Sequence, residues 1–220
     1  MAMAVARADS ARAFVIVRPI ALPRCGSQSS VRQLVAGLMS PVQPPLITVS
    51  TLPSTRSCGT CTMCCKVYRI DDLGKPAGKW CPHCAIASGC KIYEDRPQQC
   101  RAFDCVWIQD EEMAPEWKPE ISKIVFSVYP TTRFIYGQVD PGSPFAWQKE
   151  PYLSGLKAWS ERLLQERRHL LIFVGSNATL IMPTGPVPIG PMSPADGFVI
   201  RETFTARGRD YVATRVASGR

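Results

Sequence analysis

The chain has 220 residues, enough for one ordinary domain or for a small module followed by a second domain. Its net charge is +8, but residues 1–57 supply +5 of this with six arginines and one aspartate, so the remainder is nearly balanced (+3) and nucleic-acid binding is not expected. No apolar run approaches the ~18 residues of a membrane span and no secretory signal is visible, which predicts a cytoplasmic, reducing location without a membrane partner.

Residues 1–57 lack a sustained hydrophobic period, contain no lysine and end in a Pro/Ser/Thr-rich stretch. This composition predicts a disordered segment or, if translation starts at Met39, a non-native N-terminal extension. A transit peptide is the remaining alternative, because the segment is rich in arginine and poor in acidic residues. Cys25 lies alone in it and is not expected to bind metal.

Nine of the ten cysteines follow within 48 residues, which is the main chemical signal of this sequence. We call residues 58–110 the cysteine module. Glycine and proline punctuate it throughout, leaving room only for a short strand at residues 66–70 and a helical turn within residues 97–108. The nine cysteines are Cys58, Cys61, Cys64, Cys65, Cys81, Cys84, Cys90, Cys100 and Cys105.

Metal binding explains these cysteines better than disulfides. Their number is odd, and the adjacent Cys64 and Cys65 would bond each other only with strained geometry. In a reducing compartment, clustered cysteines more often serve metal or redox chemistry. All nine are therefore predicted metal ligands, and two four-coordinate ions would use eight of them, with Cys81 or Cys84 as the surplus thiol.

The spacing favours zinc, with iron or an iron–sulfur cluster as the alternative. Cys61-x2-Cys64 and Cys81-x2-Cys84 fit the template of two CxxC turns that complete a tetrahedral four-thiolate zinc site. The run that starts at Cys58 also matches the first three ligands of bacterial ferredoxins, but its fourth cysteine is misplaced. His83 lies inside the second CxxC turn, where side chains normally point away from the ion, so it is a weaker ligand candidate.

Residues 58–108 resemble the CxxCxxCC cysteine-cluster family (YkgJ type), whose members are described as zinc- or iron-chelating domains. The resemblance rests on the CxxCxxCC run at Cys58 and on the later sequence GCKIY, RP and CRxF between Gly89 and Phe103. It implies ligand roles for eight cysteines, with Cys84 beyond the usual set. Arg96 and Arg101 are expected either to offset thiolate charge or to pair with nearby carboxylates, and Tyr93 and Phe103 to shield the site.

Residues 111–220 have ordinary α/β patterning, so the predicted fold class is α+β, with an irregular metal-stabilised module and a small sheet carrying one main helix. Tyr152, Leu156, Trp159 and Leu163 fall on one helical face after Pro151. Trp117, Trp147 and Trp159 are expected in the core. Strands are predicted at residues 121–129, 133–139, 169–174, 178–182, 198–204 and 211–216, with a proline-rich loop at residues 183–194.

The function predicted from these observations is metal binding with structural ions. An iron–sulfur redox or metal-dependent enzyme is one alternative, but the sequence has no nucleotide-binding glycine loop, P-loop, GxSxG or HExxH motif. Catalysis is therefore not the favoured interpretation, and no catalytic residue is assigned. A zinc-stabilised protein-interaction module is a further alternative that sequence cannot separate from the first.

Overall fold

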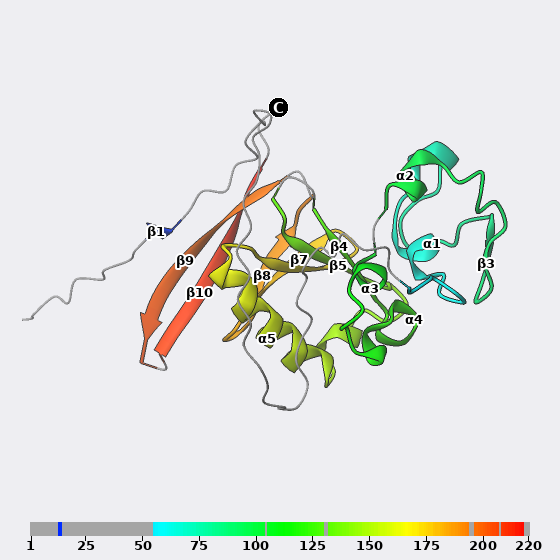
Figure 1. Cartoon of the computed structure of the whole chain (residues 1–220). Coiled ribbons are helices and arrows are strands. Elements are labelled where there is room, and N and C mark those ends of the chain that lie inside the picture. The colour runs from blue at the N-terminus through cyan, green and yellow to red at the C-terminus, as the bar shows by residue number, and fades with distance from the viewer. Residues whose placement is uncertain are drawn as a thin grey trace, which may run out of the picture.

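The computed structural model describes residues 13–14, 55–103, 105–129, 132–193, 196–206 and 208–217. These residues form short helices, one longer helix and three β-sheets, which confirms the predicted α+β class (Figure 1). Most of residues 1–57, including Cys25, lie outside the described residues. No helix in the described ranges is long and apolar enough to cross a membrane.

The longest helix, α5, has 14 residues, and the other helices are single turns. The helices are α1 (Met63–Val67), η1 (Asp71–Leu73), α2 (Gln98–Arg101), α3 (Val106–Gln109), η2 (Pro115–Trp117), α4 (Pro119–Ser122), η3 (Ala146–Gln148) and α5 (Tyr152–Gln165). The strands are β1 (Ala13–Phe14), β2 (Cys84–Ala85), β3 (Gly89–Cys90), β4 (Ile124–Val128), β5 (Ile135–Val139), β6 (Leu170–Val174), β7 (Asn177–Met182), β8 (Gly185–Pro191), β9 (Gly197–Thr205) and β10 (Gly208–Val216).

A five-stranded sheet in the order β4-β5-β6-β7-β8 forms the centre of the protein. Its neighbouring strands are antiparallel except β5 and β6, which run parallel. Parallel neighbours need a crossover connection, and α5 lies in the chain between these two strands. The helix therefore packs against one face of the sheet that it connects.

The main core lies between α5 and this face of the sheet. The predicted helical face is confirmed, because Leu156, Trp159 and Leu163 are buried against sheet residues. Trp117 and Trp147 join the same cluster, so all three tryptophans predicted as core residues are buried. The helix thus stabilises the sheet mainly through its apolar stripe.

The β9–β10 hairpin covers the opposite face of the sheet. Phe198 and Ala213 from the hairpin belong to a second buried cluster with Leu171 and Phe173 of β6. Because both faces of β6 are covered, its sequence is a continuous apolar run rather than an alternating one. The hairpin itself belongs to a separate sheet in which β1 pairs with β9.

The predicted loop at residues 183–194 is wrong, because its centre forms β8 at the edge of the sheet. Pro186 and Pro188 lie two residues apart on β8, so their backbone nitrogens face the same edge of the strand. The register shift between Ala178 and Thr179 leaves one extra residue in β8, and as a result Pro191 has the same orientation. An edge strand tolerates proline where the missing N–H would face away from its neighbour. The spacing of the prolines, rather than their number, makes a strand possible.

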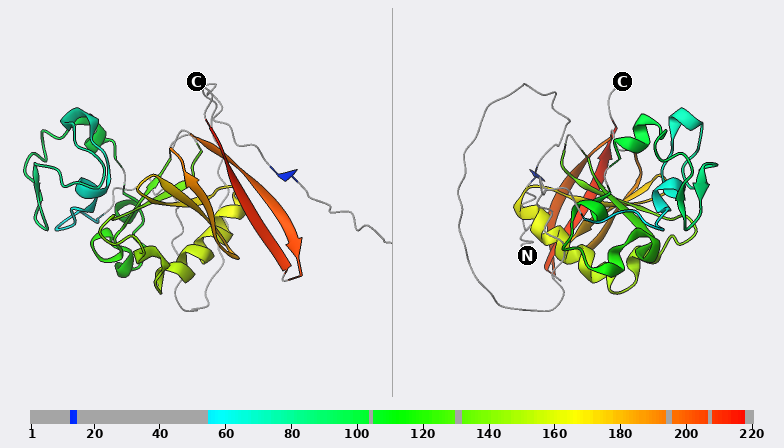
Figure 2. Two further views of the ribbon diagram at one scale, coloured as in Figure 1. Left: turned by 180° about the vertical axis from the view of Figure 1, so that it is seen from behind. Right: turned by 45° about the vertical axis from the view of Figure 1, so that its right-hand side comes forward.

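The cysteine module lies beside the β4 end of the five-stranded sheet, on the side opposite the β9–β10 hairpin in both views (Figure 2). Met63 and Val67 of α1 pack on Val125 of β4 in a third buried cluster. Lys66 Nζ forms an ion pair of 2.6 Å with Asp140 Oδ1, which follows β5. The first cysteine-bearing helix is therefore fastened directly to the sheet.

The predicted strand at residues 66–70 is also wrong, since α1 continues to Val67 and only Ile70 forms an isolated β-bridge, with Lys75. The amide of Tyr68 donates to Cys64 O at 3.3 Å, which closes the last helical turn. The helical turn predicted within residues 97–108 is present as two short helices, α2 and α3.

Candidate metal centre

The first four cysteines are placed by one turn and one helical turn. The amide of Cys61 donates to Cys58 O at 2.8 Å, and Gly59 between them has φ of 51°, which glycine adopts without strain. Cys64 and Cys65 follow on α1. The CxxCxxCC run thus turns back on itself, so that thiols distant along an extended chain become neighbours.

Cys81, Cys84 and Cys90 are placed by a second turn and a small hairpin. The amide of Cys84 donates to Cys81 O at 3.0 Å. Cys84 on β2 lies directly opposite Cys90 on β3, and the adjacent amide of Lys91 donates to His83 O at 2.8 Å. The two cysteines therefore form a non-hydrogen-bonded pair, in which the side chains share one face and approach closely.

Backbone contacts join this hairpin to α1. The amide of Cys81 donates to Cys65 O at 3.1 Å, and the amide of Ala87 donates to Thr62 Oγ1 at 3.3 Å. The two CxxC turns, separated by 16 residues in the sequence, consequently lie side by side.

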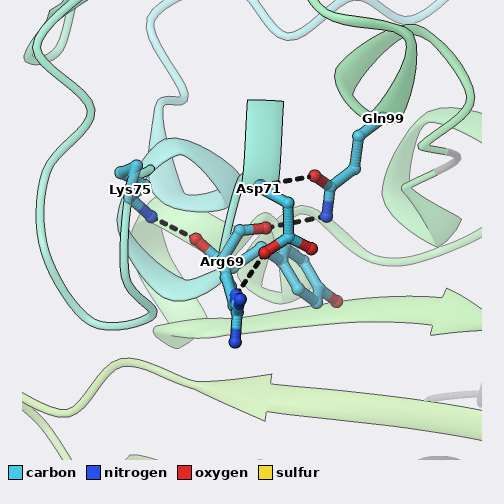
Figure 3. A network of polar contacts seen from close by, with 5 residues as sticks. Arg69, Asp71, Lys75 and Gln99 are labelled. Atoms are coloured by element: carbon cyan, nitrogen blue, oxygen red, sulfur yellow. Dashed lines mark hydrogen bonds and ion pairs between the residues drawn. The ribbon is translucent and has the colours of Figure 1, made fainter. Parts of the chain in front are cut away.

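Cys100 lies on α2, and a polar network fastens that helix to the segment after α1 (Figure 3). The side chain of Gln99 accepts from the amide of Asp71 at 2.9 Å and donates to Arg69 O at 2.9 Å. Cys105 caps α3, where its carbonyl accepts from the amide of Ile108 at 2.9 Å. The last two cysteines are thus positioned by helices rather than by CxxC turns.

These elements enclose a cavity of about 470 Å³ whose wall carries most of the module's thiols. His83, Tyr93, Arg96 and Phe103 also contribute to the wall. Cys84 and Cys105 are not part of it. The cysteines that line the cavity are Cys58, Cys61, Cys64, Cys65, Cys81, Cys90 and Cys100.

One group of thiols lies at the side of the module that faces the sheet. Cys61, Cys64 and Cys105 pack on the cluster of Met63 and Val67. Burial, with smaller contributions from the charges of Cys61 and Cys58, raises the pKa of Cys105 to about 12. Burial also raises the pKa of Cys61. We call Cys58, Cys61, Cys64 and Cys105 the sheet-side group.

The other thiols form a second group around Cys65. A hydrogen bond with Cys64, followed by burial, raises the pKa of Cys65, and Cys84 also bonds it. Burial raises the pKa of Cys84 to about 11, with Cys65 next in effect. Burial raises the pKa of Cys100, and the charges of Cys65, Cys81 and Cys90 add to that rise. We call Cys65, Cys81, Cys84, Cys90 and Cys100 the outer group.

All nine cysteines of the described chain are free thiols. Over the same described residues, no three His, Cys, Asp or Glu side chains converge closely enough to form a ready-made ion site. The raised pKa values fit neutral thiols packed as neighbours, since burial disfavours the thiolate. The described structure therefore brings the predicted ligands into two neighbourhoods without arranging them around common centres.

The arginines predicted near the site bond backbone carbonyls. Arg101 donates to Arg96 O at 2.7 Å and to Glu94 O at 2.9 Å. Arg96 donates to Tyr93 O at 2.7 Å and stacks 3.6 Å from the centre of that ring. Among the predicted roles, charge compensation is supported only for Arg96, whose charge lowers the pKa of Cys100 against its overall rise.

The aromatic residues predicted to shield the site differ in burial. Phe103 is half-buried and packs on Tyr68 with ring centres 4.7 Å apart, whereas Tyr93 is 51% exposed. Only Phe103 therefore excludes water from the cavity wall to a substantial extent.

Sequence reasoning missed Lys75, which is only 4% exposed and whose Nζ donates to the carbonyl of Lys66, the residue after Cys65. Its position in a Gly-Lys-Pro turn suggests an exposed lysine, and no local pattern indicates burial. Only the folding of the loop onto α1 brings it to the cysteines.

No family model, curated protein or solved structure gives a significant match to this chain. The resemblance of residues 58–108 to the CxxCxxCC cysteine-cluster family therefore stays a prediction.

Proposed function

We propose that the cysteine module binds two thiophilic metal ions, zinc by preference, and that these ions stabilise the module. The observation that carries the proposal is the gathering of seven free thiols, from two turns, a hairpin and two short helices, on the wall of one cavity. Thiolate sulfur is a ligand suited to zinc and to iron–sulfur clusters. So many thiols in one place are not required for packing, since the sheet has its own cores without cysteine.

The two groups of thiols support one ion each. The sheet-side group supplies four thiols, the number that a tetrahedral site needs, from Cys58, Cys61, Cys64 and Cys105. In the outer group, Cys65, Cys81, Cys90 and Cys100 all line the cavity, and the resemblance to the cysteine-cluster family leaves Cys84 as the surplus thiol. Binding requires the thiols to ionise and rotate inward, because zinc–sulfur bonds are ~2.3 Å long.

Metal analysis of protein purified without chelators tests the proposal. We expect colourless protein with about two zinc ions per chain. Brown protein absorbing near ~400 nm would show that the module holds an iron–sulfur cluster instead of zinc, and redox chemistry would then be the leading function. Protein that neither retains nor takes up metal would contradict the proposal.

Serine variants assign the ions to the two groups. Cys61→Ser and Cys100→Ser should each remove about one ion per chain, since a structural zinc site needs four ligands. Metal content measured by mass spectrometry under native conditions checks this. Cys25→Ser is the matched control and should leave the metal content unchanged.

A further inference from the structure

Lys75 is a buried cation in the cysteine module. It is 4% exposed, and among the ion pairs of the described chain none involves it. A buried ammonium group without an anionic partner is costly, so its position calls for an explanation.

The backbone explains how Lys75 is held. A short loop closes through two hydrogen bonds between Ile70 and Lys75, of 2.9 and 3.0 Å, and returns Lys75 to the end of α1. There its Nζ donates to Lys66 O at 3.0 Å. It also donates to Tyr68 O, and Figure 3 shows this side chain with its dashed contact. An ammonium group has three N–H donors, so these two carbonyls leave one N–H for another acceptor.

The Lys66 carbonyl that Lys75 Nζ contacts follows Cys65 in the chain, and the carbonyl of Cys65 accepts from the amide of Cys81 at 3.1 Å, so the ammonium group lies next to the backbone that carries these two thiols. Burial lowers its pKa, and the charges of Cys81, Cys65, Cys64 and Cys100 oppose that effect in decreasing order. Of these four cysteines, Cys81, Cys65 and Cys100 belong to the outer group. A four-thiolate zinc centre has a net charge of about −2. Metal-bound thiolates would therefore supply the negative charge that the surroundings of Lys75 otherwise lack.

Two other basic side chains of the module have partners of their own, and the charge of one of them, Arg96, already acts on Cys100. Lys66 pairs with the Asp140 carboxylate at 2.6 Å, and the guanidinium of Arg96 stacks on Tyr93. Lys75 is thus the buried lysine whose charge remains available to the outer group.

We propose that Lys75 is a positioning residue of the outer metal site, where its ammonium group offsets the negative charge of the metal–thiolate centre. This inference rests on the proposed metal binding and adds a residue that the cysteine pattern does not contain. The competing interpretation is that Lys75 only caps α1 through the two carbonyls. Charge and hydrogen bonding can be separated, because glutamine keeps a donor but not the charge, and arginine keeps both.

The test is Co²⁺ binding to the metal-stripped full chain, followed by sulfur-to-cobalt charge-transfer absorption in competition with a chelator. We expect Lys75→Gln to lower the affinity for one of the two Co²⁺ ions by about 10- to 100-fold, as the loss of residues that contact metal ligands generally does. Lys75→Arg should stay within about threefold of the original affinity, because it keeps the positive charge. Lys79→Gln is the matched control, since Lys79 is exposed in the same module and the change in net charge is the same.

A double variant shows which of the two ions Lys75 acts on. In Cys100→Ser, where the outer ion is already lost, Lys75→Gln should not alter the affinity of the remaining ion. Unchanged binding of both ions in Lys75→Gln, or equal losses in the Arg and Gln variants, would overturn the role of the charge while leaving metal binding intact. Failure of the unmutated chain to bind Co²⁺ at all would overturn both proposals.

Discussion

At the scale of single residues, His169 shows how burial controls charge outside the cysteine module. Its ring lies between Phe134 and Phe198, with ring centres 4.9 and 5.6 Å away. Within the described chain, Nδ1 of His169 is buried without a hydrogen-bond partner. Burial lowers the pKa of this histidine to about 4, because a protonated ring would lack solvation between two apolar rings.

This histidine makes stability depend on pH. Its folded pKa lies below the unfolded value of ~6.5, so the unfolded chain binds the proton first and stability falls as the pH drops from about 6.5 towards 4. We expect His169→Phe to remove about 1–2 kcal/mol of the stability change between pH 7 and pH 5. Urea unfolding of both proteins at the two pH values measures it. Equal pH dependence of the two proteins would contradict the assigned burial.

Other residue-scale features concern pairs rather than single groups. Cys64 and Cys65 are adjacent on α1, yet Cys64 packs with the sheet-side group while Cys65 contacts Cys84 of the outer group. The two side chains also hydrogen-bond each other, so the vicinal pair connects the two groups. The adjacent cysteines, which argued against a disulfide, therefore have a physical reason to be next to each other.

At the scale of elements, α5 depends on a glycine for its approach to Trp117. A Cβ added to Gly155 would lie 2.5 Å from Cζ2 of Trp117, closer than real contacts permit. The helix therefore contains glycine at a position where propensity alone favours alanine by about 1 kcal/mol.

We expect Gly155→Ala to destabilise the protein by about 1–3 kcal/mol, because overpacking outweighs helix propensity. This corresponds to a loss of about 2–4 °C in melting temperature per kcal/mol, which thermal unfolding followed by circular dichroism measures. Ser154→Ala is the control, since Ser154 is exposed on the same helix. Combining Gly155→Ala with Trp117→Phe should recover part of the loss. A rise in melting temperature for Gly155→Ala alone would refute the close packing.

The elements also show where sequence patterns succeed. The spacing of four, three and four residues from Tyr152 to Leu163 predicted α5, and the alternating or apolar runs at residues 169–174, 178–182, 198–204 and 211–216 predicted the strands β6, β7, β9 and β10. These signals are local, since periodicity and turn chemistry act over a few residues. The strand β8 was missed because its proline spacing becomes compatible only with an edge position and a bulge, which are properties of the assembled sheet.

At the scale of the whole molecule, the protein has two kinds of core. The two clusters on the faces of the five-stranded sheet are built from aliphatic and aromatic side chains without cysteine, whereas the third joins Cys61, Cys64 and Cys105 to Met63, Val67 and Val125. The sheet can therefore remain folded by apolar burial alone. The module has little other buried apolar surface, so under the proposed function bound metal supplies much of its stability.

Chelation should consequently unfold one part of the chain and spare the other. After treatment with a strong zinc chelator, we expect amides of residues 58–105 to lose protection from hydrogen exchange, while those of β5, β6 and β7 keep theirs. Hydrogen exchange with mass spectrometry resolves the two regions, and chelator saturated with zinc is the control. Uniform loss of protection across both regions would show that the module and the sheet unfold as one cooperative unit.

The sequence by itself determined the α+β class, the apolar face of α5, the three buried tryptophans and the list of candidate cysteine ligands. Composition, helical period and CxxC spacing suffice for these, because each is a property of residues close together in the chain. Only the tertiary structure decided which thiols pack on the sheet and which gather around Cys65, and that Lys75 is buried at the end of α1. Such neighbourhoods depend on contacts between segments such as Cys65 with Cys81, or Lys75 with α1, which short-range patterns do not encode.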